Sequence, residues 1–356
     1  MRSLHVVLPN DIDDPSVPSG GNRYDRRICH GLAALGWAVH EHAVQGAWPH
    51  AGAAGHAELG RVLTTLPDGA MVLIDGLIAS TVPDVLVPQS GRLRLVVLVH
   101  MPLGDGPSDR RWRERDALNT AAAVVTTSFW TRRRLIELYA LSPDHVYAAP
   151  PGVDSATLAP GSAAGSRLVC VAAVTPNKGH DQLVAALATL LDGEWSCVCV
   201  GSVDRDPGFV DQLRDQIQAH QMADRVSFVG PRSGLDLERT YANADLFVLA
   251  SRGESYGMAV TEALARGMPV LATAANGLPE ALGRAPDGSL PGILVPPDDP
   301  ASLADALRRW LGEPELRQQL RSSARARRRT LTGWTRTSEL ISRVLVKTAA
   351  EMSVGR

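Results

Sequence analysis

Residues 249–280 read LASRGESYGMAVTEALARGMPVLATAANGLPE and contain a complete strand–loop–helix–strand unit. The apolar run Leu246–Ala250 predicts a strand, and a polar loop with two glycines, 251–257, follows it. A helix is expected over about 258–266, with Gly267 as its stop. Continuous Val/Leu runs are typical of parallel strands covered on both faces, so this stretch favours an α/β fold.

The same alternation of apolar runs and helical patterns extends along the whole chain. The other predicted strands are His5–Leu8, Trp37–Ala43, Ala70–Ile74, Leu93–Val99, Ala122–Thr126, Val146–Ala149, Leu168–Ala173, Ser196–Val200, Val226–Val229, Val270–Ala272 and Ile293–Val295. A small-residue stretch, SATLAPGSAAGS at 155–166, predicts a linker between the two sets. We therefore expect two Rossmann-like domains with parallel sheets, at 1–160 and 161–330, followed by a helical segment at 331–356.

Composition excludes several classes of protein. The 356 residues carry 36 Lys+Arg against 38 Asp+Glu, and a net charge of −2 argues against a nucleic-acid binder held by bulk electrostatics. No run approaches about 18 apolar residues, and the first residues turn polar early, so we expect neither a spanning helix nor a signal peptide. The four cysteines lack zinc-ligand spacing. These features predict a cytoplasmic protein.

The loop 251–257 is expected at the carboxyl end of its strand, where open α/β sheets bind ligands. Backbone N–H groups around 257–259 would form an anion site at the start of the helix. Glu254 and Glu262 bracket that site, and carboxylates that accept hydrogen bonds from adjacent hydroxyls suit a polyhydroxylated ligand around a phosphate. The alternative is a purely structural role, with Glu254 as a helix-start charge and Glu262 on a solvated helix face.

Histidines offer two further candidates. His100 ends an apolar run beside a Pro/Gly loop, which is a good position for a binding residue; the alternative is a strand-end histidine satisfied by local hydrogen bonds. His40 and His42 suggest a metal, but we expect strand alternation to place them on opposite faces, so no metal site is predicted.

Glu254 and Glu262, with seven residues between them, resemble the E-x7-E motif of the retaining glycosyltransferases of family GT4. Other stretches resemble further motifs of that family in the same order. They are Pro18-Ser19-Gly20-Gly21, Val97-Leu98-Val99-His100, Pro151-Gly152-Val153-Asp154, Asn177-Lys178-Gly179-His180-Asp181, Gly267-Met268-Pro269-Val270, Gly277-Leu278-Pro279-Glu280 and Gly292-Ile293-Leu294-Val295-Pro296. The resemblance covers almost the whole chain.

The resemblance implies the GT-B fold, in which two Rossmann-like domains face each other across an active-site cleft and a C-terminal helix, here 331–356, crosses back to the first domain. It also implies transfer of a sugar from a UDP- or GDP-linked donor to an acceptor hydroxyl, with retention and without a metal ion or other cofactor. The departing phosphate would take the proton of the acceptor. The sequence does not identify the acceptor.

By the same resemblance, Lys178 would hold the donor diphosphate, Glu254 the sugar hydroxyls and Glu262 the nucleotide ribose, while His100 would contact the transferred sugar. Catalytic roles are therefore expected for His100, Lys178 and Glu254. The expected donor-side residues are Lys178, Gly201, Gly230, Arg252, Glu254, Ser255, Tyr256, Gly257, Met258, Ala259 and Glu262. The expected acceptor-side residues are Gly20, Gly21 and Asp75.

One position departs from the family pattern. Ala173 stands where the family has an arginine that contacts the diphosphate, and Arg252, Arg205 or Arg232 could supply the missing charge. Two alternatives therefore stay open: a GT-B phosphorylase or synthase, and a nucleotide-sugar-binding protein with impaired catalysis. A dehydrogenase is disfavoured because no dinucleotide fingerprint follows either first strand.

The arginines at 132–134 follow Trp130 and could contact anionic lipid. Such a run is more often a solvated helix face, so membrane contact is not favoured.

Overall fold

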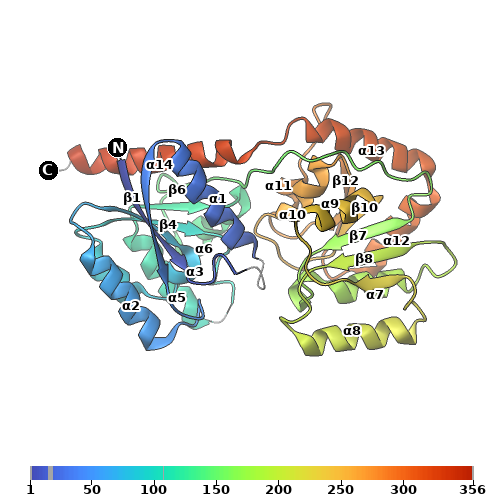
Figure 1. The fold of residues 1–356 in the computed structure, drawn as a ribbon, viewed down its shortest axis with the longest axis horizontal. Coiled ribbons are helices and arrows are strands. Elements are labelled where there is room, and N and C mark those ends of the chain that lie inside the picture. The colour runs from blue at the N-terminus through green and yellow to red at the C-terminus, as the bar shows by residue number, and fades with distance from the viewer. Residues whose placement is uncertain (1, 15–18, 107, 355–356) are drawn as a thin grey trace. The chain divides into compact units, whose positions relative to one another are not determined.

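The computed structural model describes residues 2–14, 19–106 and 108–354, which form two compact units (Figure 1). Unit 1 comprises Met1–Gly152 and Gly333–Arg356, and unit 2 comprises Val153–Thr332. Each unit contains one six-stranded sheet in which all strand pairs are parallel. The predicted pair of Rossmann-like parallel sheets is therefore confirmed.

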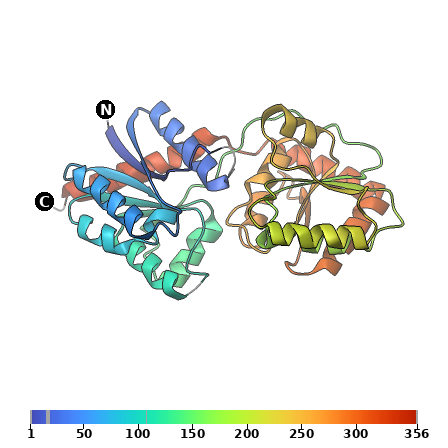
Figure 2. The same ribbon diagram turned by 60° about the horizontal axis from the view of Figure 1, so that its bottom comes forward.

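The sheet of unit 1 has the order β2-β1-β3-β4-β5-β6. Its strands are β1 (Arg2–Pro9), β2 (Trp37–Val44), β3 (Met71–Asp75), β4 (Arg94–Val99), β5 (Ala123–Thr126) and β6 (Val146–Ala148). Helices lie on both faces of this sheet (Figure 2). They are α1 (Gly20–Ala34), α2 (Gly52–Thr65), α3 (Gly76–Ala79), α4 (Pro83–Leu86), α5 (Ser108–Thr120), α6 (Phe129–Tyr139) and α14 (Trp334–Val354), with a 3₁₀ turn at Val87–Gln89.

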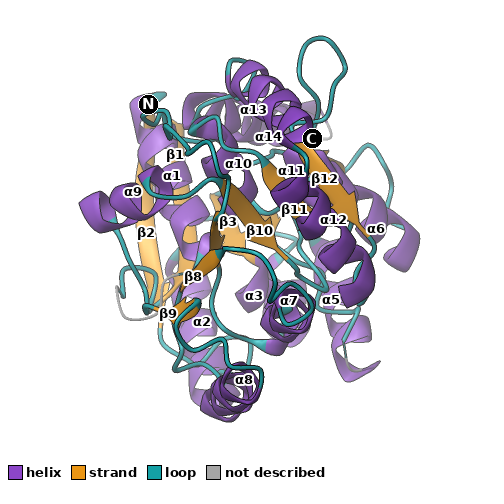
Figure 3. Cartoon of the chain, turned by 90° about the vertical axis from the view of Figure 1, so that its right-hand side faces the viewer, coloured by secondary structure: helices purple, strands orange, loops and turns teal. Residues whose placement is uncertain are grey.

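The sheet of unit 2 has the order β12-β11-β10-β7-β8-β9. Its strands are β7 (Arg167–Val171), β8 (Ser196–Val200), β9 (Val226–Phe228), β10 (Leu246–Leu249), β11 (Val270–Thr273) and β12 (Gly292–Val295). Its helices are α7 (His180–Leu187), α8 (Pro207–Ala219), α9 (Gly234–Ala242), α10 (Met258–Ala265), α11 (Leu278–Leu282), α12 (Pro300–Gly312) and α13 (Pro314–Arg328), with a 3₁₀ turn at Pro176–Lys178. Figure 3 shows these helices flanking the strands.

Strand order places the candidate site of unit 2. The chain leaves β7 toward β8 on one side and returns to β10 on the other side, so β7 and β10 are neighbours. The loops that follow these two strands emerge side by side at the carboxyl edge of the sheet, where the direction of the strand order reverses. Lys178 lies in the first loop, and 251–257 forms the second.

The C-terminal helix α14 packs against α1 within unit 1 (Figure 1). A Cβ atom on Gly31 would lie only 1.9 Å from Ser338 Oγ, so glycine permits the close approach of the two helices. The indole of Trp37 donates to the hydroxyl of Ser342 at 2.9 Å.

The stretch 155–166 is not the free linker that its composition suggests. The amide of Ser162 donates to the buried Asp245, and the indole of Trp310 donates to the carbonyl of Gly165 at 2.7 Å. Arg321 donates to the carbonyl of Ser162 at 2.6 Å. These bonds make 155–166 part of unit 2, and the chain passes between the units at 152–153, earlier than the expected boundary at 160.

Among the described residues, no helix combines the length and the apolar character needed to cross a membrane.

Candidate active site

The loop between β10 and α10 is fixed by groups from the end of β11 and from the loop after it. The hydroxyl of Thr273 donates to the carbonyl of Ser251 at 2.5 Å, and the amide of Gly277 donates to the carbonyl of Glu254 at 2.8 Å. Glycine is required at 277 because a Cβ there would lie 2.2 Å from the carbonyl oxygen of Ser255. The position of Glu254 is therefore set by its own backbone and by the neighbouring loop.

Lys178 and Glu254, which belong to separate sequence motifs, meet in the folded unit. Lys178 Nζ lies 2.6 Å from Glu254 Oε1, and the hydroxyl of Ser251 donates to the same oxygen at 2.9 Å. The two charged side chains remain 27% and 13% exposed. A solvent-accessible ion pair of this kind contributes little to stability, which leaves both groups able to exchange partners for a ligand.

Gly179 brings the turn that carries Lys178 against the end of β10. Its φ is +67°, and a Cβ atom would lie 1.9 Å from the carbonyl oxygen of Ala250. Only glycine permits both the left-handed conformation and this backbone contact.

The start of α10 has free amides. Gly257 precedes the helix with φ +101°, and no side chain caps this end among the described residues. The amides of Met258 and Ala259 belong to the first turn, where an α-helix has no carbonyl partner of its own for its N–H groups. This end of α10 can therefore donate to an anion, and the anion site itself stays a prediction.

The remaining expected donor-side residues of this segment lie in the same loop and helix. Ser255 and Tyr256 are half-buried in the loop, and Glu262 is half-buried in the second turn of α10. Burial, together with the nearby charge of Glu280, raises the pKa of Tyr256 to about 12, although Arg327 opposes the shift. Tyr256 is therefore neutral at physiological pH.

Gly201 and Gly230 follow β8 and β9, and the amide of Gly201 donates to the carbonyl of Gly230 at 3.0 Å. A Cβ on Gly201 would lie 2.0 Å from the carbonyl oxygen of Ala172, so local packing by itself requires this glycine. Gly230 has φ +70° and open space beside its Cα. Their roles in binding the donor stay predictions.

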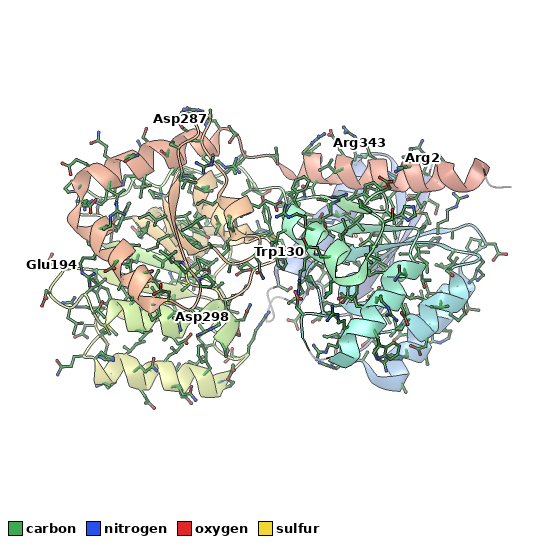
Figure 4. All side chains as sticks on the ribbon, turned by 180° about the vertical axis from the view of Figure 1, so that it is seen from behind. Arg2, Trp130, Glu194, Asp287, Asp298 and Arg343 are labelled. Atoms are coloured by element: carbon green, nitrogen blue, oxygen red, sulfur yellow. The ribbon has the colours of Figure 1, made fainter. Side chains whose placement is uncertain are left out.

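Arg252 is engaged by other groups of unit 2. Its guanidinium donates to Asp181 at 2.7 and 2.9 Å, to Asp298 at 2.7 Å and to the carbonyl of Pro176. Asp298 is labelled in Figure 4. Although burial raises the pKa of Asp181, the hydrogen bonds and charge of Arg252 outweigh it and the pKa is lowered. This network weighs against Arg252 as the replacement for the arginine missing at Ala173.

The other two arginines suggested as replacements are Arg205 and Arg232. Arg232 donates to the hydroxyl of Thr240 at 2.7 Å and is exposed, as is Arg205.

Unit 1 brings its own candidates together around His100. Asp75 ends β3, His100 directly follows β4, and Gly20 and Gly21 form the first turn of α1. A Cβ on Gly21 would lie 3.4 Å from the His100 ring, and His100 Nε2 lies 3.4 Å from Asp75 Oδ2. Of the expected residues of unit 1, Gly21, Asp75 and His100 are thus close neighbours.

The sequence analysis missed Asp25, which is the nearest partner of His100. Asp25 Oδ1 lies 2.9 Å from His100 Nε2, and the carboxylate is buried. The available signal was its position on the apolar stripe of α1, beside Tyr24 and one turn before Ile28, because a charged residue on a buried stripe needs a partner.

Charge and burial compete in this cluster. Burial favours a neutral His100, but the charges and hydrogen bonds of Asp25 and Asp75 outweigh it and raise its pKa to about 10. Burial raises the pKa of Asp25 to about 7, while His100 opposes this shift. Burial acts in the same direction on Asp75, but hydrogen bonding and the charge of His100 leave its pKa lowered. The two carboxylates thus favour the protonated form of the ring, and burial opposes it.

Two groups of side chains bear on metal binding. Asp25, Asp75 and His100 offer ligand atoms within 4.8 Å of one another, a spacing that could hold a divalent ion, so the expectation of no metal stays a prediction. The expectation that His40 and His42 lie on opposite faces is wrong. Residues two apart on a strand share a face, and both rings stack on His5, with centroids 5.0 and 5.3 Å away.

Two of the three arginines considered for lipid contact are bound to neighbouring groups. Arg132 donates to the carbonyls of Val146 and Pro143, and Arg134 forms an ion pair with Asp105. Trp130, labelled in Figure 4, is half-buried.

Part of the chain matches a family of known proteins. Residues 165–327 match the model of the family described as glycosyl transferases group 1. A D-inositol 3-phosphate glycosyltransferase of Kineococcus radiotolerans is 34% identical over 256 residues, which cover 65% of this chain and 59% of that protein. The enzyme of the same name from Jonesia denitrificans is 30% identical over 273 residues, which cover 70% and 63%. The chain thus spans less than two thirds of the length of these relatives.

Solved structures share the architecture. The sucrose-phosphate synthase of Thermosynechococcus elongatus superposes with a TM-score of 0.81 at 21% sequence identity. The superposition covers 99% of this chain and 100% of the synthase chain. Anabaena HepE in complex with UDP-glucose superposes with a TM-score of 0.75 at 18% sequence identity. This superposition covers 98% of this chain and 100% of the HepE chain. At these identities the likeness concerns the fold, which is GT-B. The family model over residues 165–327 and the sequence relatives support a glycosyltransferase of the GT4 type.

Proposed function

We propose that the chain transfers a sugar from a nucleoside diphosphate sugar to a hydroxyl group of an acceptor, with retention of anomeric configuration. The contact between Lys178 and Glu254 beside the uncapped start of α10 carries this proposal. It joins a cation, free amides and a carboxylate at the carboxyl edge of one sheet. The fold is shared with HepE, whose crystal structure holds UDP-glucose.

Departure of the diphosphate builds negative charge on its oxygens. Lys178 and the amides of Met258 and Ala259 would stabilise that charge, and a well-placed donor of this kind is worth about 3–4 kcal/mol in the transition state. In this proposal the positive charge comes from the chain itself, and no metal ion or other cofactor is required. The departing phosphate oxygen would take the proton of the attacking acceptor hydroxyl.

Glu254 would bind the hydroxyls of the sugar, and Glu262 the ribose. In the free protein Lys178 occupies one oxygen of Glu254, so binding of the diphosphate to Lys178 would release that oxygen for a sugar hydroxyl. Donor binding would thus replace the contact between Lys178 and Glu254 by a contact of Lys178 with the diphosphate and a contact of Glu254 with the sugar. We place His100 at the substrate as well, as the family resemblance implies.

A thermal-shift panel with UDP, GDP, ADP and inorganic phosphate tests donor binding. A nucleotide at about 100 times its Kd should stabilise the protein by roughly 2.7 kcal/mol. Lys178→Ala should weaken the response. The sequence has only one other lysine, Lys347, which contacts Tyr147 in unit 1, so Lys347→Ala is a matched control.

Analysis of the reaction products, together with the ligand responses, distinguishes a retaining transferase from a phosphorylase and from a protein that binds the donor without catalysis. With the stabilising nucleotide as its glucose conjugate, NMR of the product should show the anomeric configuration of the donor, and an inverted anomer would refute retention. Stabilisation by phosphate alone would indicate a phosphorylase. Donor binding without transfer to any acceptor or to water would indicate that the change at Ala173 marks lost catalysis.

A further inference from the structure

Both carboxylates near His100 engage the same ring nitrogen. Nε2 lies 2.9 Å from Asp25 Oδ1 and 3.4 Å from Asp75 Oδ2. Within the described part of the chain, no hydrogen bond engages Nδ1, and the His100 side chain is 13% exposed. Nε2 therefore orients the ring, and Nδ1 is the nitrogen available to a ligand.

The stability of α1 does not explain Asp25. Its side chain is buried, and Oδ2 has no hydrogen-bond partner. A buried carboxylate oxygen without a partner destabilises the fold, so an apolar residue on this stripe would serve the packing better. The carboxyl group interacts with His100 Nε2 at 2.9 Å and with the neighbouring carboxyl group of Asp75.

The ring is also held from its sides. Tyr24 meets it edge-on, with ring centroids 5.4 Å apart, and the Tyr24 hydroxyl donates to the carbonyl of Ala149 at 2.7 Å. Gly21 lies beside the same ring, and a Cβ atom added to it would lie 3.4 Å from Cδ2 of His100. The hydroxyl of Thr127 donates to the backbone carbonyl of His100.

We propose that Asp25 is a positioning residue for His100, holding Nε2 so that Nδ1–H donates a hydrogen bond to an oxygen atom of the bound substrate. This oxygen belongs to a hydroxyl or a phosphoryl group, since both accept from an imidazolium. The inference rests on the proposed function in one respect, the assignment of His100 to the substrate.

The protonation state follows from the groups that face the ring. They are Asp25 and Tyr24 from α1 and Asp75 from the end of β3. Burial keeps Tyr24 neutral by raising its pKa, so the charge that faces the ring comes from Asp75 and from Asp25, whose own pKa burial raises to about 7. Two carboxylates on Nε2 favour the doubly protonated ring, which makes Nδ1 a donor rather than an acceptor.

The direct test is NMR of the imidazole nitrogens in the full chain from pH 6 to 10, with His100 assigned by the loss of its signals in His100→Gln. The wild type should show both nitrogens protonated at pH 8. In Asp25→Asn the apparent pKa of His100 should fall by about 1–3 pH units. Asp245→Asn removes an equally buried carboxylate from unit 2 and should leave the His100 signals unchanged.

Three results would overturn the proposal: a neutral His100 in the wild type at pH 8, the same titration in Asp25→Asn as in the wild type, or a change of the His100 signals on adding EDTA, which would reveal a bound cation. The wild-type measurement decides even where Asp25→Asn does not fold.

Kinetics add a readout that a merely structural role would not move. In folded Asp25→Asn, kcat should fall by about 10- to 100-fold, because a displaced ring misplaces its hydrogen bond. The alkaline limb of the pH–rate profile should shift with the NMR titration, and an unchanged profile would contradict the proposal. A wild type without transferase activity would refute the proposed function, while NMR would still decide the role of Asp25.

Discussion

Gly179→Ala tests whether a backbone contact assembles the donor side of the site. At φ +67° an alanine costs roughly 1–2 kcal/mol more than glycine. Its Cβ would also lie 1.9 Å from the carbonyl oxygen of Ala250, and this backbone atom cannot turn away as a side chain would. Overpacking of this kind costs about 1–3 kcal/mol, so the two effects together should destabilise unit 2 by about 2–5 kcal/mol.

Gly230→Ala is the matched control. Gly230 has nearly the same φ, +70°, in the same unit, but nothing lies within 4 Å of an added Cβ. This variant should lose only the conformational part, about 1–2 kcal/mol. The difference between the two variants therefore measures the contact with Ala250.

Scanning calorimetry of the full chain provides the comparison. At about 2–4 °C per kcal/mol for a unit of this size, Gly179→Ala should melt about 2–12 °C below Gly230→Ala. It should also lose more of the stabilisation by nucleotide, because the turn that carries Lys178 must move away from β10. Equal melting temperatures would refute the argument that this close approach positions the lysine.

Three other predictions concern single side chains. Arg252→Ala should destabilise unit 2 by only about 0–1 kcal/mol, since its ion pairs are partly exposed, and should leave UDP affinity in calorimetry unchanged; a tenfold loss would reveal a phosphate contact. Because the folded-state pKa of His100 is raised, its stabilising charge is complete below pH 6.5 and is lost toward about pH 10. The melting temperature of the wild type should fall more across that window than that of His100→Gln, and parallel curves would contradict the shift. Glu114 is buried and accepts from Ser80, the amides of Leu103 and Gly104, and Tyr139, so Glu114→Gln should cost about 1–3 kcal/mol in urea unfolding. A change below about 0.5 kcal/mol would show that the loop after β4 does not depend on this carboxylate.

Local pattern was sufficient for the secondary structure of the sheets. Continuous apolar runs such as Leu246–Leu249 became buried parallel strands because both faces of each sheet are covered. Ends of elements were less predictable. The strand expected at Ala70–Ile74 lies at Met71–Asp75, because Asp75 still pairs with Leu98 in the sheet.

The linker predicted at 155–166 from its composition is instead held by tertiary contacts. Small residues at 155–166 lack periodicity and resemble a linker, but Asp245, Trp310 and Arg321 of unit 2 bind their backbone groups. Such bonds join residues far apart along the chain, and no local pattern records them. The same limit hid the network that engages Arg252.

The sequence by itself determined the two parallel sheets and the strand–loop–helix unit that carries Glu254 and Glu262, because strand periodicity and spacing within one such unit are local properties. Only the tertiary structure joined Lys178 to Glu254, since that contact depends on β7 and β10 being neighbours in the sheet. It likewise revealed the role of Asp25, because only the folded unit brings its carboxylate to 2.9 Å from His100 Nε2. Buried charges are resolved by partners in space, and those partners are set by strand order and helix packing.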